Sequence, residues 1–377
     1  MYKLIDDYIK SLLSNSTWDK PIWNIEKISQ GKGPHWNYID GVMINSLLQL
    51  YKITNDKQYL NFSDNFIDGY IDESGNILGY NKEDYNIDNI CEGRVLFDLY
   101  NYTKKEKYKL AINKLKAQLD THPRTKEGSF WHKLIYPNQV WLDGLYMSMP
   151  FLTQYENYFG NKNYQDIVLQ YKNVRKNMYN EKDKLYYHAF DYSRNSFWCD
   201  KKTGNSKNYW LRAMGWYLVS LIDVIDYMDE MLYDEKRYLI DLFREGIKGI
   251  LNYLDKDSNM FYQVINKGSL EGNYLETSGS AMISYAVLKA VRLEVLQEKY
   301  FEIGKNIFDG ICNRYLKEDN NKLTLEGICL VAGLGPENNK RRDGSFEYYI
   351  SEPVVKNDAK GVGPLIMAYI ELIRQLD

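Results

Sequence analysis

Apolar residues recur at helical spacing along most of the chain, and segments with the strict alternation of a β-strand are almost absent. One local pattern returns five times: an apolar helix, a short polar turn, and a second helix with a tyrosine near its start. These tyrosines are Tyr59, Tyr108, Tyr164, Tyr238 and Tyr300. Their separations run from 49 to 74 residues, so the repeated unit is a helical hairpin with loops of variable length. The pattern predicts an all-α chain.

A glycine stands near the start of the first helix of each hairpin, at Gly41, Gly93, Gly144, Gly215, Gly279 and Gly363. Glycine costs about 1 kcal/mol inside a helix, so its recurrence at one phase indicates inner helices that approach one another closely. We expect six of them, at roughly 36–51, 86–103, 138–159, 207–228, 274–296 and 358–376. Alternating with outer helices, they predict a closed (α/α)6 barrel, one domain over residues 1–377. The alternative, an open superhelix of tetratricopeptide type, has a shorter and steadier period.

Charge and hydropathy narrow the classes of partner. The chain has 48 Lys and Arg against 51 Asp and Glu, a formal net charge of −3, so we expect no nucleic-acid partner. The longest apolar run, residues 328–334, is too short to span a membrane, and the mean hydropathy is −0.53. Asp6, Asp7 and Lys10 interrupt the apolar stretch that a signal peptide needs. We therefore expect a cytoplasmic protein without a membrane partner.

Cysteine and histidine spacing gives no sign of a metal centre. The four cysteines lie far apart without a C-x-x-C pair, and the four histidines show neither H-x-x-x-H nor H-E-x-x-H spacing. The sequence therefore predicts neither a disulfide framework nor a metal site, and no cofactor.

Two carboxylates stand where inner helices begin, and in a closed barrel the loops before these helices meet at one mouth. Asp88 lies in a first helical turn, where the ordinary interpretation is a cap or a partner of the helix dipole. Asp143 lies in the apolar sequence WLDG beside Trp141, where an acid without a function is costly. A helix N-terminus lowers a carboxyl pKa, whereas a general acid needs it raised. Burial and the charge of Asp88 would have to supply that rise for Asp143.

Cationic and aromatic side chains accompany these acids. Arg212 lies in the apolar run YWLRAMGW, where an unpaired guanidinium is expensive, so it is expected to meet an anion of the protein or of a ligand. His132, Lys133 and His188 occupy the same set of loops, although such residues are more often structural or solvated. Five tryptophans in these segments favour a carbohydrate site. They are Trp36, Trp131, Trp141, Trp198 and Trp210.

Long ordered motifs add a family resemblance. The runs YNIDNICEGR, PRTKEGSFWHKLIYPNQVWLDGLYMSMPFL, HAFDYSRNSFWCDKKTGNSKNYWLRAMGWY, GNYLETSGSAM and RRDGSFEYYISEPVVKNDAKGVGP resemble glycoside hydrolase family 105, the unsaturated rhamnogalacturonyl hydrolases. The related unsaturated glucuronyl hydrolases share the fold and the paired acids. The resemblance implies a cytoplasmic (α/α)6-barrel enzyme that removes a 4,5-unsaturated galacturonyl residue from lyase-generated oligosaccharides of pectin.

Site residues follow from the resemblance by matching motif positions. Asp143 would be the catalytic acid and base, with Asp88 as its partner. Further pocket positions fall on Tyr38, His132, Lys133, Trp141, His188, Trp210 and Arg212. The substrate carboxylate needs a cation, for which Arg212 offers a bidentate fork and Lys133 a point charge. Both remain candidates.

Three other functions stay open at this point. One is an unsaturated glucuronyl hydrolase that acts on other lyase products. Another is a conventional inverting glycosidase on the same barrel, with Asp143 and Asp88 as acid and base. The third is a helical scaffold or sugar-binding module without catalysis, which would be indifferent to the loss of Asp143. The sequence does not indicate an oligomeric state.

Overall fold

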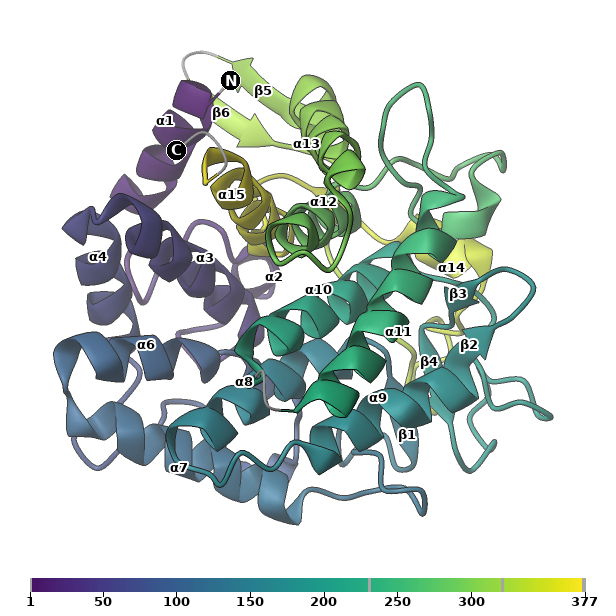
Figure 1. Ribbon diagram of the computed structural model, residues 1–377, viewed down its shortest axis with the longest axis horizontal. Helices are drawn as coiled ribbons and strands as arrows, with labels where there is room; N and C mark the ends of the chain where they lie inside the picture. The colour runs from purple at the N-terminus through teal and green to yellow at the C-terminus, as the bar shows by residue number, and fades with distance from the viewer. Residues whose placement is uncertain (1, 230–231, 320–321, 375–377) are drawn as a thin grey trace.

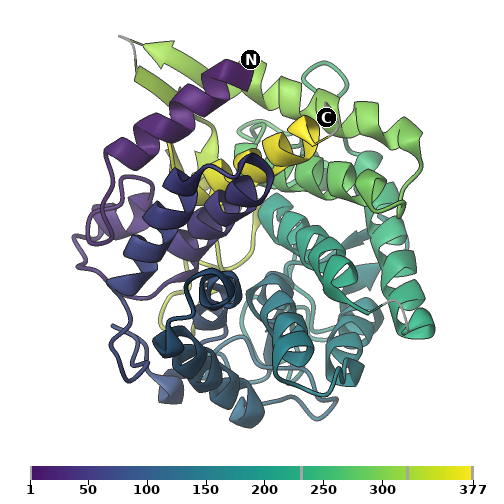
Figure 2. The same cartoon turned by 60° about the vertical axis from the view of Figure 1, so that its left-hand side comes forward.

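The computed structural model describes residues 2–229, 232–319 and 322–374, and most of them are helical (Figure 1). Inner helices form a ring in which each contacts the next, and the last contacts the first, so the ring is closed (Figure 2). In ring order they are α3 (Tyr38–Thr54), α5 (Asp88–Cys91) with α6 (Arg94–Thr103), α8 (Gly144–Tyr158), α10 (Leu211–Tyr227), α12 (Thr277–Arg292) and α15 (Ala359–Ile373). This arrangement confirms the expected (α/α)6 barrel.

Outer helices pack behind the inner ones. Five of them follow their inner partner in sequence: α4 (Lys57–Asp68), α7 (Glu106–Thr121), α9 (Gln165–Met178), α11 (Tyr233–Leu251) and α13 (Phe301–Tyr315). The sixth, α1 (Tyr2–Ser14), comes from the opposite end of the chain and packs on α15. The ring of Tyr369 on α15 contacts the ring of Tyr2, with centroids 5.5 Å apart, and the Tyr369 hydroxyl donates to Asp6 Oδ1 at 2.9 Å. The last hairpin is thus assembled from both ends of the sequence.

The recurring glycines do let inner helices approach each other. A Cβ on Gly215 of α10 would lie 3.4 Å from the Cα of Gly279 in α12, and one on Gly363 of α15 would lie 2.7 Å from Val42 Cγ1 in α3. At Gly144 a glycine is needed for a different reason, because a Cβ there would lie 3.1 Å from Nδ1 of His132. That glycine makes room for a loop side chain at the start of α8.

Two expected inner helices differ from the structure. The segment 86–103 is not one helix, because the helical structure is interrupted at residues 92–93, between α5 and α6. The helix expected from 138 begins only at Gly144, since β1 (Gln139–Trp141) pairs antiparallel with β4 (Ala189–Asp191). The other inner helices begin and end within a few residues of their expected bounds, and the expected end at 376 lies outside the described residues.

Short strands and turns fill the loops around the ring. Three further two-stranded sheets pair β2 (Tyr179–Asn180) with β3 (Leu185–Tyr186), β5 (Leu316–Asp319) with β6 (Lys322–Leu325), and β7 (Ile328–Cys329) with β8 (Val354–Val355). The remaining short helices are α2 (Ile25–Ser29) and α14 (Phe346–Ser351), with 3-10 turns at Lys82–Asp84, Ile265–Lys267 and Glu298–Tyr300. Strands of two to four residues are too short to show an alternating pattern.

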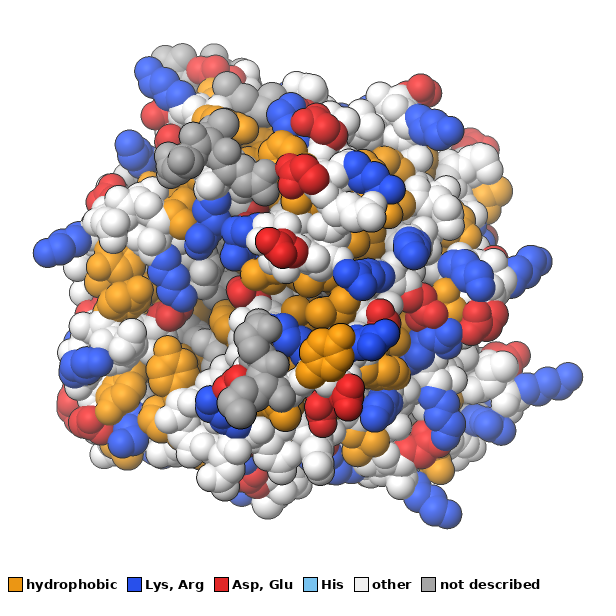
Figure 3. Space-filling view, in the orientation of Figure 1, with side chains coloured by type: hydrophobic (Ala, Val, Ile, Leu, Met, Phe, Trp, Pro, Cys, Tyr) orange, Lys and Arg blue, Asp and Glu red, His pale blue; other side chains and the backbone are white. Residues whose placement is uncertain are grey.

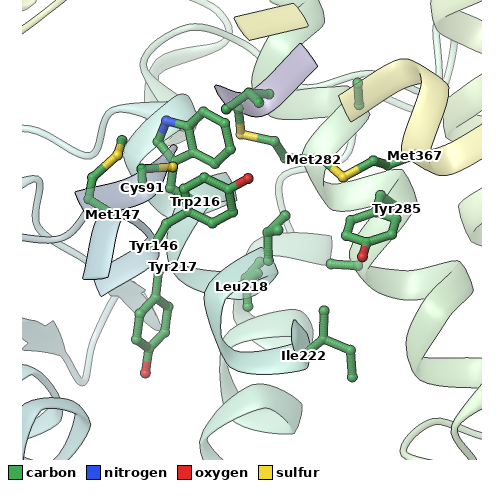
Figure 4. Close-up of a cluster of buried hydrophobic side chains, with 14 of the residues drawn as sticks. Cys91, Tyr146, Met147, Trp216, Tyr217, Leu218, Ile222, Met282, Tyr285 and Met367 are labelled. Carbon is green, nitrogen blue, oxygen red and sulfur yellow. The ribbon is translucent and has the colours of Figure 1, made fainter. Parts of the chain in front are cut away.

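Large buried side chains fill the interior of the ring. Tyr146 of α8 stacks on Trp216 of α10 with ring centroids 4.1 Å apart, and Met282, Tyr285 and Met367 lie on the neighbouring inner helices (Figure 4). On the face shown in Figure 3, acidic and basic side chains are interspersed. Within the described ranges, no helix has both the length and the apolar character needed to cross a membrane.

Candidate active site

The two acids lie at the mouth of the barrel where inner helices begin. Asp88 is the first residue of α5, and Asp143 directly precedes α8. The chain before Asp88 runs beside the loop that contains His132 and Lys133, because the amide of Ile87 donates to the carbonyl of His132 at 3.1 Å. This pairing of two loops brings Asp88 next to both side chains.

The Asp88 carboxylate is held as an anion by a neighbouring cation. Lys133 Nζ lies 2.7 Å from Oδ2, and His132 Nε2 lies 3.4 Å from Oδ1. Burial opposes ionisation of Asp88, but the charge of Lys133 and the contact with His132 outweigh it and lower the pKa of Asp88. The carboxylate is therefore engaged with the neighbouring loop, and the interpretation of Asp88 as a helix cap does not describe its contacts.

Asp143 is in the opposite electrostatic state. It occupies the cap position of α8, yet its side chain makes no capping hydrogen bond. Part of the residue stays open to solvent, but Oδ1 is shut off from water and has no hydrogen-bond partner among the described residues. Burial, followed by the charge of Asp88, raises the pKa of Asp143 to about 7. Burial and the charge of Asp88 are the two causes that we expected to raise the pKa of Asp143 if it acts as a general acid.

An aromatic stack forms one wall of the site. The ring of His132 lies on Trp141 with centroids 4.4 Å apart and an angle of 6° between the planes. Tyr136 also stacks on Trp141, at 5.0 Å, and the indole N–H donates to Gln139 Oε1 at 3.0 Å. The indole is thus fixed on β1, directly before Asp143.

His188 reaches the site through the pairing of β1 with β4. The amide of Leu142 donates to the His188 carbonyl at 2.9 Å, and the imidazole meets Trp141 edge-on at 5.5 Å. Burial lowers the pKa of His188 and of His132 to about 3, so both rings are neutral near pH 7. Nε2 of His188 and Nδ1 of His132 are buried and have no partner within the described part of the chain. With Asp143 Oδ1, three polar atoms of this site lack a protein partner.

Tyr349 supports His188, and sequence reasoning did not single it out. Its hydroxyl lies 2.7 Å from His188 Nδ1, and its ring stacks on Trp210, whose ring centroid lies 4.8 Å from that of His188. Tyr349 lies on α14, within the motif RRDGSFEYYISEP that carries the family resemblance. The motif was the available signal, but only the fold brings it beside His188.

Arg212 meets an anion of the protein, one of the two expected possibilities. Nη2 lies 3.6 Å from Glu276 Oε1, and Nε donates to Ser278 Oγ at 2.7 Å. The other donors reach the main-chain carbonyls at residues 329 and 330. The guanidinium is fully buried and committed to protein acceptors, while its charge still acts on Asp143.

Tyr38 and the tryptophans complete the account of the expected residues. Tyr38 begins α3, where burial raises its pKa well above the usual value, and the charges of Asp88 and Arg212 act on it. The structure thus brings the nine expected site residues to one mouth. Trp36 and Trp198 do not belong there as sugar platforms, because both are almost completely buried in the protein. Among the described residues, no group of three or more His, Cys, Asp or Glu side chains is arranged to hold a metal ion.

Comparison with known proteins identifies relatives of this chain. A solved glycoside hydrolase of family 105 from Clostridium acetobutylicum (C. acetobutylicum ATCC 824) is 41% identical, covers 99% of both chains and superposes with a TM-score of 0.91. The unsaturated rhamnogalacturonyl hydrolase YesR of Bacillus subtilis is 22% identical over 267 residues, 68% of this chain and 72% of its own.

A more distant structure shares the fold alone. The unsaturated glucuronyl hydrolase of Bacillus sp. GL1 has a TM-score of 0.69 at 14% identity, covering 100% of this chain and 97% of that one. The family model described as Glycosyl Hydrolase Family 88 matches residues 14–376. With a match over nearly its whole length and a close relative in family 105, this chain belongs to the glycoside hydrolases of families 88 and 105.

Proposed function

We propose that this enzyme removes a terminal 4,5-unsaturated galacturonyl residue from oligosaccharides that a lyase releases from rhamnogalacturonan. One observation carries the proposal: a carboxyl group whose pKa is raised to about 7, Asp143, stands beside an ionised carboxylate, Asp88. Environments that push two acids apart in this way separate a proton donor from its electrostatic partner. The similarity to YesR supports the rhamnogalacturonan-derived substrate.

The chemistry of an unsaturated uronide suits such a pair. Its C4=C5 double bond is an enol ether, so protonation at C4 places an oxocarbenium ion at C5. Water then adds to C5, and the resulting hemiketal opens to a ketone at C5, which leaves a hemiacetal at C1 that expels the aglycone as an alcohol. Protonated Asp143 delivers the proton to C4, and its conjugate base takes the proton from the attacking water. A well-placed proton transfer of this kind contributes about 10²–10⁴-fold to the rate.

The neighbouring residues have supporting parts in the proposal. Asp88 keeps the pKa of Asp143 high and orients the water or a sugar hydroxyl. The Lys133 side chain is 24% exposed, whereas the guanidinium of Arg212 is tied to protein acceptors. We therefore assign the contact with the substrate carboxylate to Lys133. Trp141 is itself buried, and its part is to hold the His132 ring in place beside Asp88.

Isotope labelling tests the reaction. In heavy water, hydration of the enol ether places one solvent deuterium at C4 of the released keto-uronate. Direct displacement at C1, as in an inverting glycosidase, gives no deuterium at C4 from the cleavage step. Samples are taken at early time points, because the C4 hydrogens of the released ketone exchange with solvent later. A product without deuterium at C4 would defeat the hydration mechanism and the role given to Asp143, even for an active glycosidase.

A substrate panel tests the specificity. Loss of the ultraviolet absorbance of the conjugated double bond is followed with unsaturated galacturonyl and unsaturated glucuronyl disaccharides, and a saturated disaccharide serves as control. Faster turnover of the galacturonyl substrate supports the proposal. Faster turnover of the glucuronyl substrate would instead show that the enzyme is an unsaturated glucuronyl hydrolase. The cytoplasmic location and the single-domain organisation stay predictions of the sequence.

A further inference from the structure

The loop between β7 and α14, residues 330–345, lies against the aromatic side of the active site, and we call it the rim loop. Leu334 of this loop is fully buried in a small apolar cluster that contains Trp141. One residue earlier, the amide of Gly333 donates to the hydroxyl of Tyr348 on α14 at 2.9 Å. The rim loop is therefore anchored at the catalytic mouth on both of these contacts.

The rim loop holds the side chain of Arg342 close to Trp141. A Cβ on Gly333 would lie 3.3 Å from Nη1 of Arg342 and 3.3 Å from Cη2 and Cζ3 of Trp141. The guanidinium and the indole edge thus border the same bare stretch of backbone. The amide of Gly335 donates to the Arg342 carbonyl at 2.9 Å, which closes the loop on itself. Because Trp141 comes two residues before Asp143, the guanidinium stands at the side of the mouth that carries the catalytic acid.

The guanidinium of Arg342 has no acceptor within the described ranges of the chain. Its charged neighbours in sequence are paired differently, since Arg341 lies 2.8 Å from Glu352 and Asp343 lies 3.2 Å from Lys207. Arg342 is partly buried, yet none of its side-chain nitrogens belongs to the buried polar atoms that lack a partner. These nitrogens are therefore in reach of solvent, and an oxygen of a ligand can approach them.

Two other cations of the mouth differ from Arg342 in this respect. Lys133 already faces Asp88 at 2.7 Å, and Arg212 faces Glu276 at 3.6 Å. A long cationic side chain loses conformational freedom when it is held against a loop, and no ion pair with the described protein offsets that cost for Arg342. An anion from outside the chain would supply the missing partner.

We propose that Arg342 binds the carboxylate of a galacturonate in the aglycone, the part of the oligosaccharide that leaves after cleavage. The inference rests on the proposed function, in which Lys133 contacts the carboxylate of the residue that is removed. Galacturonate alternates with rhamnose in rhamnogalacturonan, so a fragment longer than a disaccharide carries a further carboxylate beyond the neutral rhamnose. A guanidinium presents a planar fork that matches a carboxylate with two parallel hydrogen bonds. Arg342 thereby makes the enzyme prefer the longer fragments.

Steady-state kinetics on two fragments test the preference. The unsaturated disaccharide ends at rhamnose, whereas the unsaturated tetrasaccharide also contains the second galacturonate. We expect a kcat/KM about tenfold or more higher for the tetrasaccharide, the size of one charge-assisted contact. Arg342→Gln should abolish this advantage through a higher KM, with the loss confined to the tetrasaccharide. Equal kcat/KM for both fragments in the wild-type enzyme, or an equal loss on both in the variant, would refute the role of Arg342.

A matched control removes the same charge from the same loop. Lys340 is exposed and lies two residues before Arg342, so Lys340→Gln changes the net charge equally without touching the proposed contact. We expect it to keep the preference for the tetrasaccharide. The same loss of preference in Lys340→Gln would show a general attraction by charge and would overturn the assignment to Arg342. The melting temperature of Arg342→Gln should stay close to that of the wild type, because no described hydrogen bond or ion pair of this side chain is lost.

Calorimetry with the leaving part alone separates this inference from the proposed reaction. The trisaccharide of rhamnose, galacturonate and rhamnose is the aglycone of the tetrasaccharide and needs no turnover. We expect saturable binding to the wild-type enzyme, about tenfold weaker binding to Arg342→Gln, and no binding of rhamnose. Absence of trisaccharide binding would refute the site at Arg342 even if the disaccharide is cleaved. Binding that depends on Arg342 without cleavage of either unsaturated fragment would support the carboxylate contact and refute the proposed function.

Discussion

Two aspartates, Asp223 fully buried and Asp143 partly buried, show how one fold gives the same side chain opposite properties. Asp223, on α10, lies between Arg94 and Lys289, with a hydrogen bond from Tyr285, and these partners outweigh its burial and lower its pKa to about 2. Asp143, at the mouth of the barrel, is also removed from water but faces another acid, and its pKa rises to about 7. Burial is common to both, so the partners decide the outcome.

The difference separates a group that stabilises the fold from one that reacts. The oxygens of Asp223 are occupied by three donors, which hold the three helices α6, α10 and α12 together. The Asp143 Oδ1 atom lacks a partner within the described residues and is the place where a proton can be exchanged with a substrate. A buried carboxyl oxygen without a partner is costly to keep, so its presence beside a second acid fits a reacting group better than a structural one.

The largest expected effect comes from removing the proton of Asp143. Asp143→Asn keeps the shape of the side chain and should lower kcat by about 10²–10⁴-fold, the range of a lost proton transfer, with little change in KM. Steady-state kinetics on an unsaturated disaccharide measure both constants. Near-normal turnover would place the acid elsewhere and remove the contrast with Asp223.

The same substitution at the other aspartate should affect stability instead. Asp223→Asn removes the carboxylate partner of the buried Arg94 and one of the two carboxylate partners of Lys289. It should lower the free energy of unfolding by about 3–5 kcal/mol, as for other broken buried pairs. Urea denaturation measures the loss, and kcat at a temperature well below melting should be retained. Asp226→Asn, which removes a partly exposed partner of Lys289, is the control and should cost about 1 kcal/mol or less.

Lys133→Met separates the role of Lys133 from that of Asp143. Without the ammonium, the pKa of Asp88 should rise, and a charge-assisted contact to the substrate carboxylate should be lost, which raises KM about tenfold or more. KM and the pH dependence of kcat measure the two effects. An unchanged KM would show that Lys133 pairs with Asp88 but does not bind the substrate. Arg212 would then be the remaining candidate for the contact with the substrate carboxylate.

A smaller effect is expected in the pH dependence of stability. Because folding raises the pKa of Asp143 from 3.8 to about 7, its protonated form contributes stability below pH 4 that is lost as the pH rises through 7. Asp143→Asn has no such loss, so its melting temperature relative to wild type should rise between pH 4 and 7 and then level off. We expect a gain of about 1–3 °C at pH 8. A constant difference across this range would contradict the raised pKa.

No effect is expected from a chelator. The proposed steps use only protons and water, so incubation with EDTA should leave kcat unchanged. Loss of activity that a divalent ion restores would require a different chemistry for the pair of Asp88 and Asp143.

The sequence predicted the barrel better than it predicted the site's surroundings. Helical periodicity and the recurring glycines report local packing that repeats six times, and the structure confirms both the ring and the close approaches at Gly215 and Gly363. The break at residues 92–93 and the strand before Asp143 were missed because each involves only a few residues. Neither leaves a periodic signal.

The electrostatic states of the site depend on contacts between distant segments. Asp143 could be chosen from its apolar neighbours, and the need for a raised pKa could be reasoned from its place at a helix start. The contact of Tyr349 with His188 joins residues 161 positions apart. The ion pair of Arg212 with Glu276 joins α10 to the residue that precedes α12. Such partners follow from closing the ring, which no local pattern encodes.

The pairing of α1 with α15 has a consequence for how the chain folds. Tyr8 Oη donates to Asn357 Oδ1 at 2.7 Å across 349 positions, so the sixth hairpin joins two segments that are synthesised far apart in time. Five hairpins can form during synthesis, but the ring closes only afterwards, and contacts of such long separation slow folding. The two helices lie side by side near Tyr2 and Tyr369, whose ring centroids are 5.5 Å apart. A circular permutant that joins them and opens another loop would convert this late, long-range step into a local one.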